Sequence, residues 1–495
     1  MTPSQLPDLN DLAHDDPIAI AQRFEDPPAT RQVYCNRTLN FRAVKAVGYD
    51  MDYTLVHYKV RDWEGRAYAH LRQRLEAAGW PVHALEFEPD RVMRGLVIDK
   101  RKGNLVKSNR FGYIKQAMHG TRMLGQDELR EVYGRTLVEL VDTQRWMFLN
   151  TLFEISEGCM YAQLVDLYDQ GRLAGLASYE ELYRKVRYTL DRAHLEGALK
   201  AEILAQPDLY VELDPDLPMA LLDQRESGKK LLMVTNSEWS YTRAMMGYSF
   251  DRYLPEGMSW RDLFDVIIVS SRKPAFFQSI QPLYEVVNDE GLLRPYNDNL
   301  VPGKIYAGGS AEVLERSLGL DGDQIAYVGD HMLSDAYTSK KLQQWRTVAI
   351  LRELEEEIDA VESWRKGQAL LDQMMAEKER LEHAFSQLRV LRQRQRSHHG
   401  PVPVMAGHHD LQDYMNTLRE RLVDLDSAIA PLVAESNSLH NPYWGLMMRT
   451  GNDKSLLARM VERHADAYTS RVSNFAWETP YVFLRSLRGT LPHDV

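Results

Sequence analysis

The sequence has few cysteines, no excess of positive charge and no long apolar segment. Its two cysteines, Cys35 and Cys159, cannot form a disulfide framework, which is typical of a reducing cytoplasm. The net charge of −11 argues against duplex nucleic acid and against an anionic membrane surface as partners. No run of about 18 apolar residues predicts a membrane span, and residues 1–17 lack the features of a signal peptide. We therefore expect a cytoplasmic protein that acts on a small molecule.

The chain has an ordinary globular composition, with 44% hydrophobic and 26% charged residues. Its 495 residues suffice for several domains with a large core. Composition and periodicity predict an N-terminal arm (1–40), a core (41–60 with 205–350), a mainly helical cap inserted into that core (61–204), a helical hairpin (351–440) and a C-terminal segment that packs on the core (441–495).

Short apolar runs alternate with helical periodicity in the predicted core. These candidate strands are residues 43–47, 230–234, 266–269, 325–328 and 347–350. Strands that alternate with helices form parallel sheets covered on both faces, so the predicted fold class is α/β with a doubly wound parallel sheet. Within the insertion, residues 94–107 predict a β-hairpin, and the periodicity from Leu129 to about Leu204 predicts helices.

The first candidate strand leads into Asp50-Met51-Asp52-Tyr53-Thr54. In an extended segment Asp50, Asp52 and Thr54 would point to the same side. Because ligands of parallel sheets bind at the carboxyl ends of the strands, this pair of carboxylates suits a nucleophile with a neighbouring acid/base, or half of a magnesium site. The structural alternative is a strand end followed by an Asx-type turn.

Each later strand ends in polar residues of the kind that phosphate chemistry needs. Thr235-Asn236-Ser237 offer hydroxyl and amide groups at a helix start, Lys273 can neutralise a phosphoryl oxygen, and Asp330 and Asp335 can hold magnesium. Taken one at a time, they are better explained as an N-cap, a solvated lysine and an Asp helix cap. Their joint order along the chain favours the functional interpretation.

That order resembles the haloacid dehalogenase superfamily of phosphatases. More narrowly, the chain resembles the cytosolic purine 5′-nucleotidases, in the branch that prefers IMP and GMP. The stretches that carry this resemblance are Asp50 to Leu55, Arg94 to Val97, Thr235 to Ser237, Arg272 to Phe277, Ala307 to Ser310, Gly329 to His331, Ser339 to Lys341 with Trp345 to Thr347, and Phe475 to Pro492.

The resemblance implies roles for the residues at the strand ends. Asp50 would attack phosphorus and form an aspartyl-phosphate, while Asp52 would protonate the leaving ribose oxygen and then deprotonate water. Mg²⁺ would be held by Asp50, the Asp52 backbone carbonyl and Asp330, with Asp335 in support, and Lys273 would add positive charge. Thr235, Asn236 and Ser237 would bind the phosphate oxygens. Transfer of the phosphate to a nucleoside instead of water is a further activity of the family.

Specificity is expected in the cap, where Arg187, Asp191 and His194 fall on one face of a predicted helix. Arg187 and Asp191 match the family's base-recognition residues, and they could bind the O6/N7 edge and the N1–H of a 6-oxopurine. Phe153 matches a base-stacking aromatic residue, and His194 and Lys200 match contacts to ribose or phosphate. The structural alternatives are an exposed Arg–Asp pair and a core phenylalanine.

Three functional hypotheses follow. The first is a Mg²⁺-dependent 5′-nucleotidase of IMP and GMP, and the second is a phosphatase of the same superfamily with another phosphomonoester as substrate. The third is a nucleotide-binding regulatory protein that has lost catalytic turnover. Evidence against this hypothesis is that all four residues expected to carry the chemistry are present: Asp50, Asp52, Lys273 and Asp330. By analogy with the family, we expect a dimer or tetramer, with the helical hairpin and the C-terminal segment as candidate interfaces.

Overall fold

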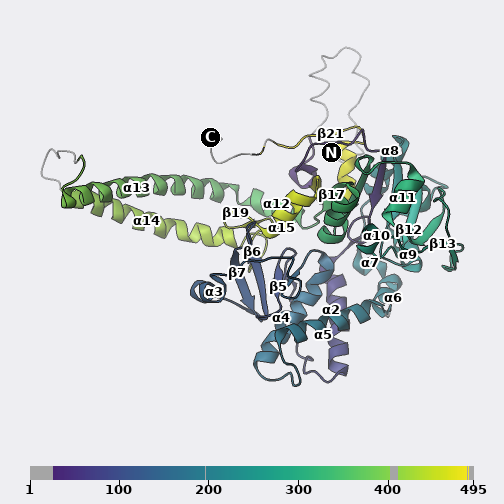
Figure 1. The fold of residues 1–495 in the computed structure, drawn as a ribbon, viewed down its shortest axis with the longest axis horizontal. Coiled ribbons are helices and arrows are strands. Elements are labelled where there is room, and N and C mark those ends of the chain that lie inside the picture. Colours follow the sequence, from purple (N-terminus) through teal and green to yellow (C-terminus); the bar gives the residue numbers. More distant parts are fainter. Residues whose placement is uncertain (1–25, 196, 402–410, 488, 490–495) are drawn as a thin grey trace, which may run out of the picture. The chain divides into compact units, whose positions relative to one another are not determined.

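The computed structural model describes residues 26–195, 197–401, 411–487 and 489 (Figure 1). The chain divides into two compact units, residues 1–355 with 447–495, and residues 356–446. The helices of the described residues include none with the length and hydrophobicity of a membrane span.

A ten-stranded sheet forms the centre of the larger unit, in the order β1-β20-β17-β16-β3-β11-β12-β15-β13-β14. The strands in that order are Tyr34–Cys35, Ala467–Thr469, Arg346–Ile350, Ile325–Gly329, Ala46–Tyr49, Lys230–Val234, Val266–Val269, Ile305–Gly308, Leu283–Val286 and Leu293–Pro295. The strands from β20 to β15 pair in parallel, and β1, β13 and β14 are joined to the sheet by antiparallel pairing. The fold is therefore α/β with a largely parallel sheet, as predicted.

The central strand β3 is buried along its whole length, since it lies between β16 and β11. Gly48 allows the ring of Tyr327 on β16 to lie against it, because a Cβ atom at position 48 would be 2.9 Å from Tyr327 Cδ2. Helices between the strands include α8 (Leu217–Glu226), α9 (Trp239–Phe250) and α11 (Ala311–Leu318). This packing fixes the strand whose end carries the paired aspartates.

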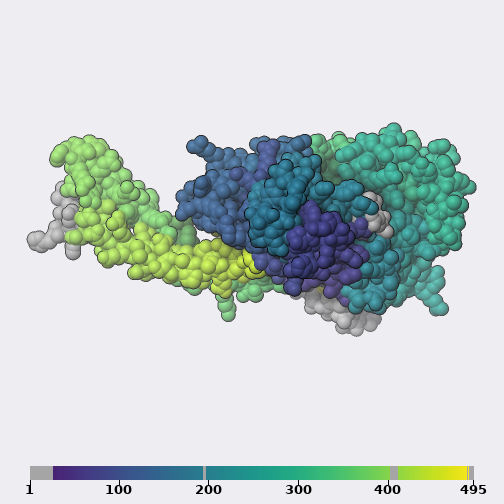
Figure 2. Space-filling model, turned by 90° about the horizontal axis from the view of Figure 1, so that it is seen from below, coloured from purple at the N-terminus to yellow at the C-terminus, as the bar shows by residue number. Residues whose placement is uncertain are grey.

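The insertion leaves the core through β4 (His57–Tyr58) and returns through β10 (Val211–Glu212), and these two strands pair with each other. It contains α2 (Val60–Ala77), α3 (Gln126–Tyr133), α4 (Ile155–Asp169), α5 (Tyr179–Leu195) and α6 (Ala198–Ala205). In the space-filling view the insertion, in blue, lies beside the later core segments, in teal and green (Figure 2).

The insertion is less helical than predicted, because it also holds a five-stranded antiparallel sheet in the order β8-β7-β6-β5-β9. Its strands are Arg122–Met123, Ile114–His119, Asn104–Ser108, Val97–Asp99 and Trp146–Phe148. The predicted hairpin is β5 with β6. The helical prediction after Leu129 fails between α3 and α4, where the aromatic strand β9 pairs with β5. Cross-strand packing of Trp146 and Phe148 outweighs local helical periodicity there.

The smaller unit contains two long helices, α13 (Arg365–Ser397) and α14 (Leu411–Asn437), preceded by α12 (Leu354–Ser363) (Figure 1). Lys378 pairs with Asp426 and Arg421 with Glu377, so ion pairs link the two helices at one position along their length. The C-terminal segment that follows contributes β20 to the main sheet, between β1 and β17.

Candidate active site

The polar motifs meet where the parallel strands β3, β11, β12 and β16 end. Since these strands are neighbours in the sheet, their carboxyl ends bring Asp50, Thr235, Lys273 and Asp330 to one edge. Strand β3 ends at Tyr49, and Tyr53 adopts a left-handed φ of 54°. The paired aspartates therefore lie in a tight turn and not, as expected, along an extended strand.

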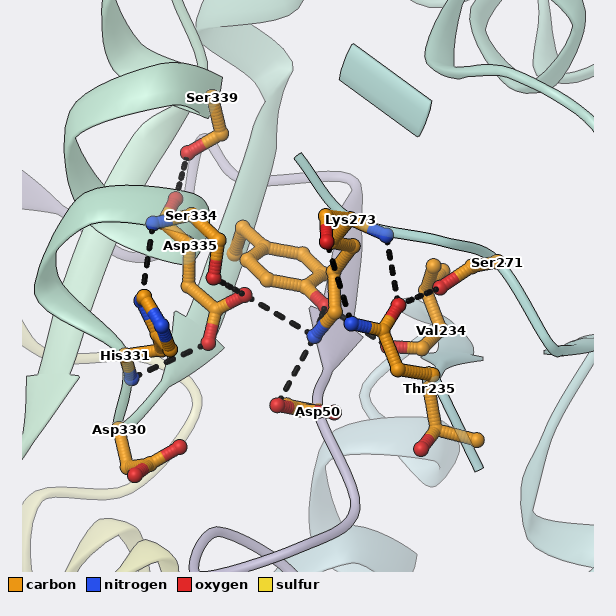
Figure 3. Close-up of polar contacts among 12 residues, drawn as sticks. Asp50, Val234, Thr235, Ser271, Lys273, Asp330, His331, Ser334, Asp335 and Ser339 are labelled. Carbon is orange, nitrogen blue, oxygen red and sulfur yellow. Dashed lines mark hydrogen bonds and ion pairs between the residues drawn. The ribbon is translucent and has the colours of Figure 1, made fainter. Parts of the chain in front are cut away.

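Lys273 lies at the centre of this edge, between two carboxylates (Figure 3). Its Nζ is 2.8 Å from Asp50 Oδ2 and 2.9 Å from Asp335 Oδ1, and it donates a hydrogen bond of 3.0 Å to the Tyr327 hydroxyl. Burial opposes its charge, but Asp335 and Asp50 outweigh burial and raise the pKa of Lys273 well above its ordinary value. The side chain is therefore a fixed positive charge beside Asp50.

Asp50, Asp330 and Asp335 form a buried carboxylate triad, with one oxygen of each within 4.8 Å of the others. Burial raises the pKa of Asp50 to about 6, although Lys273 opposes the shift. Burial and the neighbouring Asp50 and Asp335 raise the pKa of Asp330 well above its ordinary value. One lysine cannot neutralise three carboxylates, and an all-oxygen donor set suits a hard divalent cation. The triad can therefore hold a metal ion.

Asp52 lies apart from the triad, and hydroxyl groups bind both of its carboxyl oxygens. Tyr58 donates to Oδ1 at 2.6 Å, and Ser237 donates to Oδ2 at 2.7 Å. Lys200 on α6 is 3.4 Å from the Ser237 Oγ and forms an ion pair of 2.7 Å with Glu238. The insertion thus reaches the turn that follows β11.

The segment Thr235-Asn236-Ser237 connects β11 to α9. Thr235 Oγ1 accepts a hydrogen bond of 3.0 Å from the Ser237 amide, which closes a small turn. Asn236 Oδ1 accepts from the Lys273 amide at 2.6 Å and from the Ser271 hydroxyl at 3.0 Å, while its Nδ2 donates to the Lys273 carbonyl at 3.2 Å. Asn236 therefore fixes the loop that carries Lys273, a role that the sequence reasoning missed.

The predicted base-recognition residues lie on α5 and in the short turn before α4. Arg187 Nη1 is 2.7 Å from Oε2 of the buried Glu157, and its Nε is 3.3 Å from Asp191 Oδ1. The centroids of the Phe153 and Tyr53 rings are 4.6 Å apart, so Phe153 packs next to the turn that carries Asp52. His194 is in α5, but its side chain lies outside the described residues.

Two residues of the insertion that contact Asp330 were not assigned a role from the sequence. The Thr151 hydroxyl donates to Asp330 Oδ2 at 2.7 Å. Arg94, which is 1% exposed, donates to the Asp330 carbonyl at 3.2 Å and pairs with Glu353 at 2.6 Å. One indication in the sequence that Arg94 has a role is that Arg94 begins one of the stretches that resemble the nucleotidases. There was no such indication for Thr151. These two contacts hold the loop that carries Asp330.

A parallel α/β sheet that brings a buried carboxylate triad and a charged lysine to its carboxyl edge fits a hydrolase of phosphoric monoesters. Residues 33–495 match the sequence model of the 5′ nucleotidase family, and the chain belongs to that family. It is also 25% identical over 483 residues to a 5′-nucleotidase domain-containing protein of Dictyostelium discoideum, across 94% of this chain and 75% of the relative. Family membership confirms the prediction of a phosphoric monoester hydrolase of the 5′-nucleotidase type.

Proposed function

We propose that this protein is a Mg²⁺-dependent 5′-nucleotidase of the haloacid dehalogenase type that hydrolyses purine nucleoside 5′-monophosphates, with IMP and GMP preferred. The observation that carries the proposal is the position of Lys273, 2.8 Å from Asp50 and 2.9 Å from Asp335 within the carboxylate triad. This arrangement places a potential carboxylate nucleophile, a fixed positive charge and a set of cation ligands within one small volume.

The chemistry follows from these charges. Asp50 attacks phosphorus and displaces the nucleoside, so an anion approaches an anion, and positive charge is needed to offset their repulsion. Lys273 supplies one such charge. When bound, Mg²⁺ would supply further charge and polarise a phosphoryl oxygen, with Asp50, Asp330, Asp335 and the Asp52 carbonyl as the residues that would hold it.

Asp52 serves both halves of the reaction. It first gives a proton to the leaving ribose oxygen, and it then takes a proton from the water that attacks the aspartyl-phosphate. Thr235, Asn236 and Ser237 are proposed to bind the phosphate oxygens through hydroxyl and amide groups. A nucleoside hydroxyl that enters in place of water would make the same intermediate a phosphate donor, which gives nucleoside phosphotransferase activity.

Base selection is proposed to reside in the insertion. Arg187 and Asp191 lie 3.3 Å apart on α5 and could present a donor and an acceptor to a 6-oxopurine. Adenine would place an amino group against the arginine and leave polar groups unpaired, which costs binding energy. Phe153 is the proposed stacking surface, with His194 and Lys200 as contacts to ribose or phosphate.

A substrate panel tests the proposal directly. Phosphate release from IMP, GMP, AMP, UMP and sugar phosphates should be highest for IMP and GMP, should require Mg²⁺, and should disappear in Asp50→Asn. A preference for sugar phosphates or UMP would favour the second hypothesis, a phosphatase of another phosphomonoester. Wild-type turnover in Asp50→Asn would contradict the mechanism.

We also propose that the protein works in the cytoplasm as a dimer or tetramer, with no nucleic acid or membrane partner. The long pair α13 and α14 supports this proposal, because several apolar side chains on it are exposed. These include Leu370, Val390, Tyr414 and Val423. Light scattering of the purified protein gives its mass in solution, and a monomer at micromolar concentration would contradict the proposal.

A further inference from the structure

The carboxyl group of Asp52 is held by two hydroxyl groups whose surroundings differ. Tyr58 donates to Oδ1 from β4, the strand on which the chain leaves the core. Ser237 donates to Oδ2 from the turn after β11, which is proposed to bind phosphate. The two oxygens of one carboxyl group are thus bound from different elements.

Tyr58 is the more firmly fixed of the two donors. It is 2% exposed, and its register partner in the β4–β10 pair is Val211. Its hydroxyl accepts a hydrogen bond of 3.0 Å from Tyr241, which leaves its own proton for Asp52. Its ring packs edge-on to Tyr53, with centroids 5.2 Å apart. Sheet pairing, ring packing and a second hydroxyl therefore all fix the direction of the Tyr58 hydroxyl.

Ser237, by contrast, would have a second acceptor for its proton once substrate is bound. The Lys200 ammonium, 3.4 Å away, donates to the Ser237 oxygen, and a phosphate bound at the end of β11 would offer negatively charged acceptors to the Ser237 proton. If the Ser237 hydroxyl turns to a phosphate oxygen, Asp52 Oδ2 loses its donor and Oδ1 keeps Tyr58. The carboxyl group is then held at one oxygen and open at the other.

We propose that Tyr58 is a positioning residue that holds Asp52 by Oδ1 and so makes Oδ2 the oxygen that exchanges protons. This inference rests on the proposed function. In the first step Oδ2 gives its proton to the leaving ribose oxygen as the bond from that oxygen to phosphorus breaks and the Asp50–phosphorus bond forms. In the second step Oδ2 takes a proton from water as the water oxygen bonds to phosphorus and the Asp50–phosphorus bond breaks.

The test compares Tyr58→Phe with Tyr53→Phe, with IMP as substrate and saturating Mg²⁺. Tyr53 is a matched control, since its hydroxyl is buried in the same cluster and has no hydrogen-bond partner among the described residues. Tyr58→Phe should lower kcat by about 10- to 100-fold, because proton transfer by a well-oriented group contributes at least that much, and KM should change by less than about threefold. Tyr241→Phe should lower kcat less than Tyr58→Phe. Thermal melting confirms that each variant is folded.

A second substrate separates proton transfer from general damage. p-Nitrophenolate leaves without a proton, so its release in the first turnover of p-nitrophenyl phosphate should be nearly as fast in Tyr58→Phe as in the wild type. Wild-type kcat for IMP in Tyr58→Phe, or an equal loss in Tyr53→Phe, would overturn the role of Tyr58. Two further measurements distinguish the levels of failure. Unchanged IMP turnover in Asp52→Asn would overturn the proposed role of Asp52, and absence of IMP hydrolysis by the wild type would overturn the proposed function.

Discussion

The Thr151 hydroxyl donates a hydrogen bond of 2.7 Å to Asp330, and so a residue of the insertion contacts the carboxylate triad of the core. Thr151 begins a capping box in which Glu154 accepts a hydrogen bond from the Thr151 amide at 3.3 Å. Glu154 Oε1 is in turn 4.0 Å from Arg187 Nη1. A short polar path therefore connects the proposed base-recognition residue with a proposed metal ligand.

Replacement of Thr151 by valine should weaken metal binding. Valine keeps the shape but removes the donor to Asp330, and loss of a hydrogen bond to a metal ligand typically costs about 10- to 100-fold in metal affinity or activity. A titration of phosphate release against Mg²⁺ should show a higher half-activating concentration. Thr417→Val, in α14, is the control and should leave the curve unchanged; an equal shift in both variants would contradict the role of Thr151.

Replacement of Lys273 by methionine should abolish turnover and destabilise the fold. The change leaves Asp50 and Asp335 buried without their cation, and breaking a buried ion pair costs about 3–5 kcal/mol. Urea denaturation with a chelator present measures the free energy of unfolding. The double variant with Asp335→Asn should recover part of the loss, because it removes one of the two stranded charges. A single variant as stable as the wild type would rule out this account.

Gly48→Ala should destabilise the protein and should also disturb the active site. The added Cβ would be 2.9 Å from the ring of Tyr327, whose hydroxyl accepts a hydrogen bond from Lys273. Overpacking of this kind typically costs about 1–3 kcal/mol, and activity should fall with it. Gly65→Ala, in α2, is the matched control. Its Cβ would make an ordinary contact at 3.5 Å with Phe87, so better helix propensity should stabilise the protein by about 0.5–1 kcal/mol.

Stability should fall as the pH is lowered below 6.5, in part because of His57. Burial, assisted by Arg352, lowers the pKa of His57 from 6.5 to about 4, and neither ring nitrogen has a hydrogen-bond partner among the described residues. Between these values the unfolded chain binds the extra proton, so each step down in pH favours unfolding. Urea midpoints of His57→Leu should depend less on pH in this window than those of the wild type. His83→Leu, which removes an exposed histidine, is the matched control.

The sequence was sufficient to predict which residues gather at the carboxyl edge of the sheet, because they follow the strands. Asp50, Thr235 and Asp330 each come directly after a short apolar run, and parallel strands bring such positions together. The Arg187–Glu157 ion pair and the contact of Thr151 with Asp330 depend on how the insertion packs, which no local pattern encodes. The predicted hairpin gave two strands of the insertion's sheet, but β9 was missed for a similar reason, because it is stabilised by its pairing with β5.

The order of strands in the main sheet has a consequence for how the protein is made. Among the described strands, β1, at residues 34 and 35, pairs only with β20, at residues 467–469, and β20 also pairs with β17. During synthesis, α13 and α14 must leave the ribosome before β20 exists. Until then β17 is an exposed parallel edge and β1 has no partner, a state that favours association with other chains. The nascent chain should therefore need protection by a chaperone between the synthesis of β17 and that of β20, after the proposed catalytic residues have already been translated.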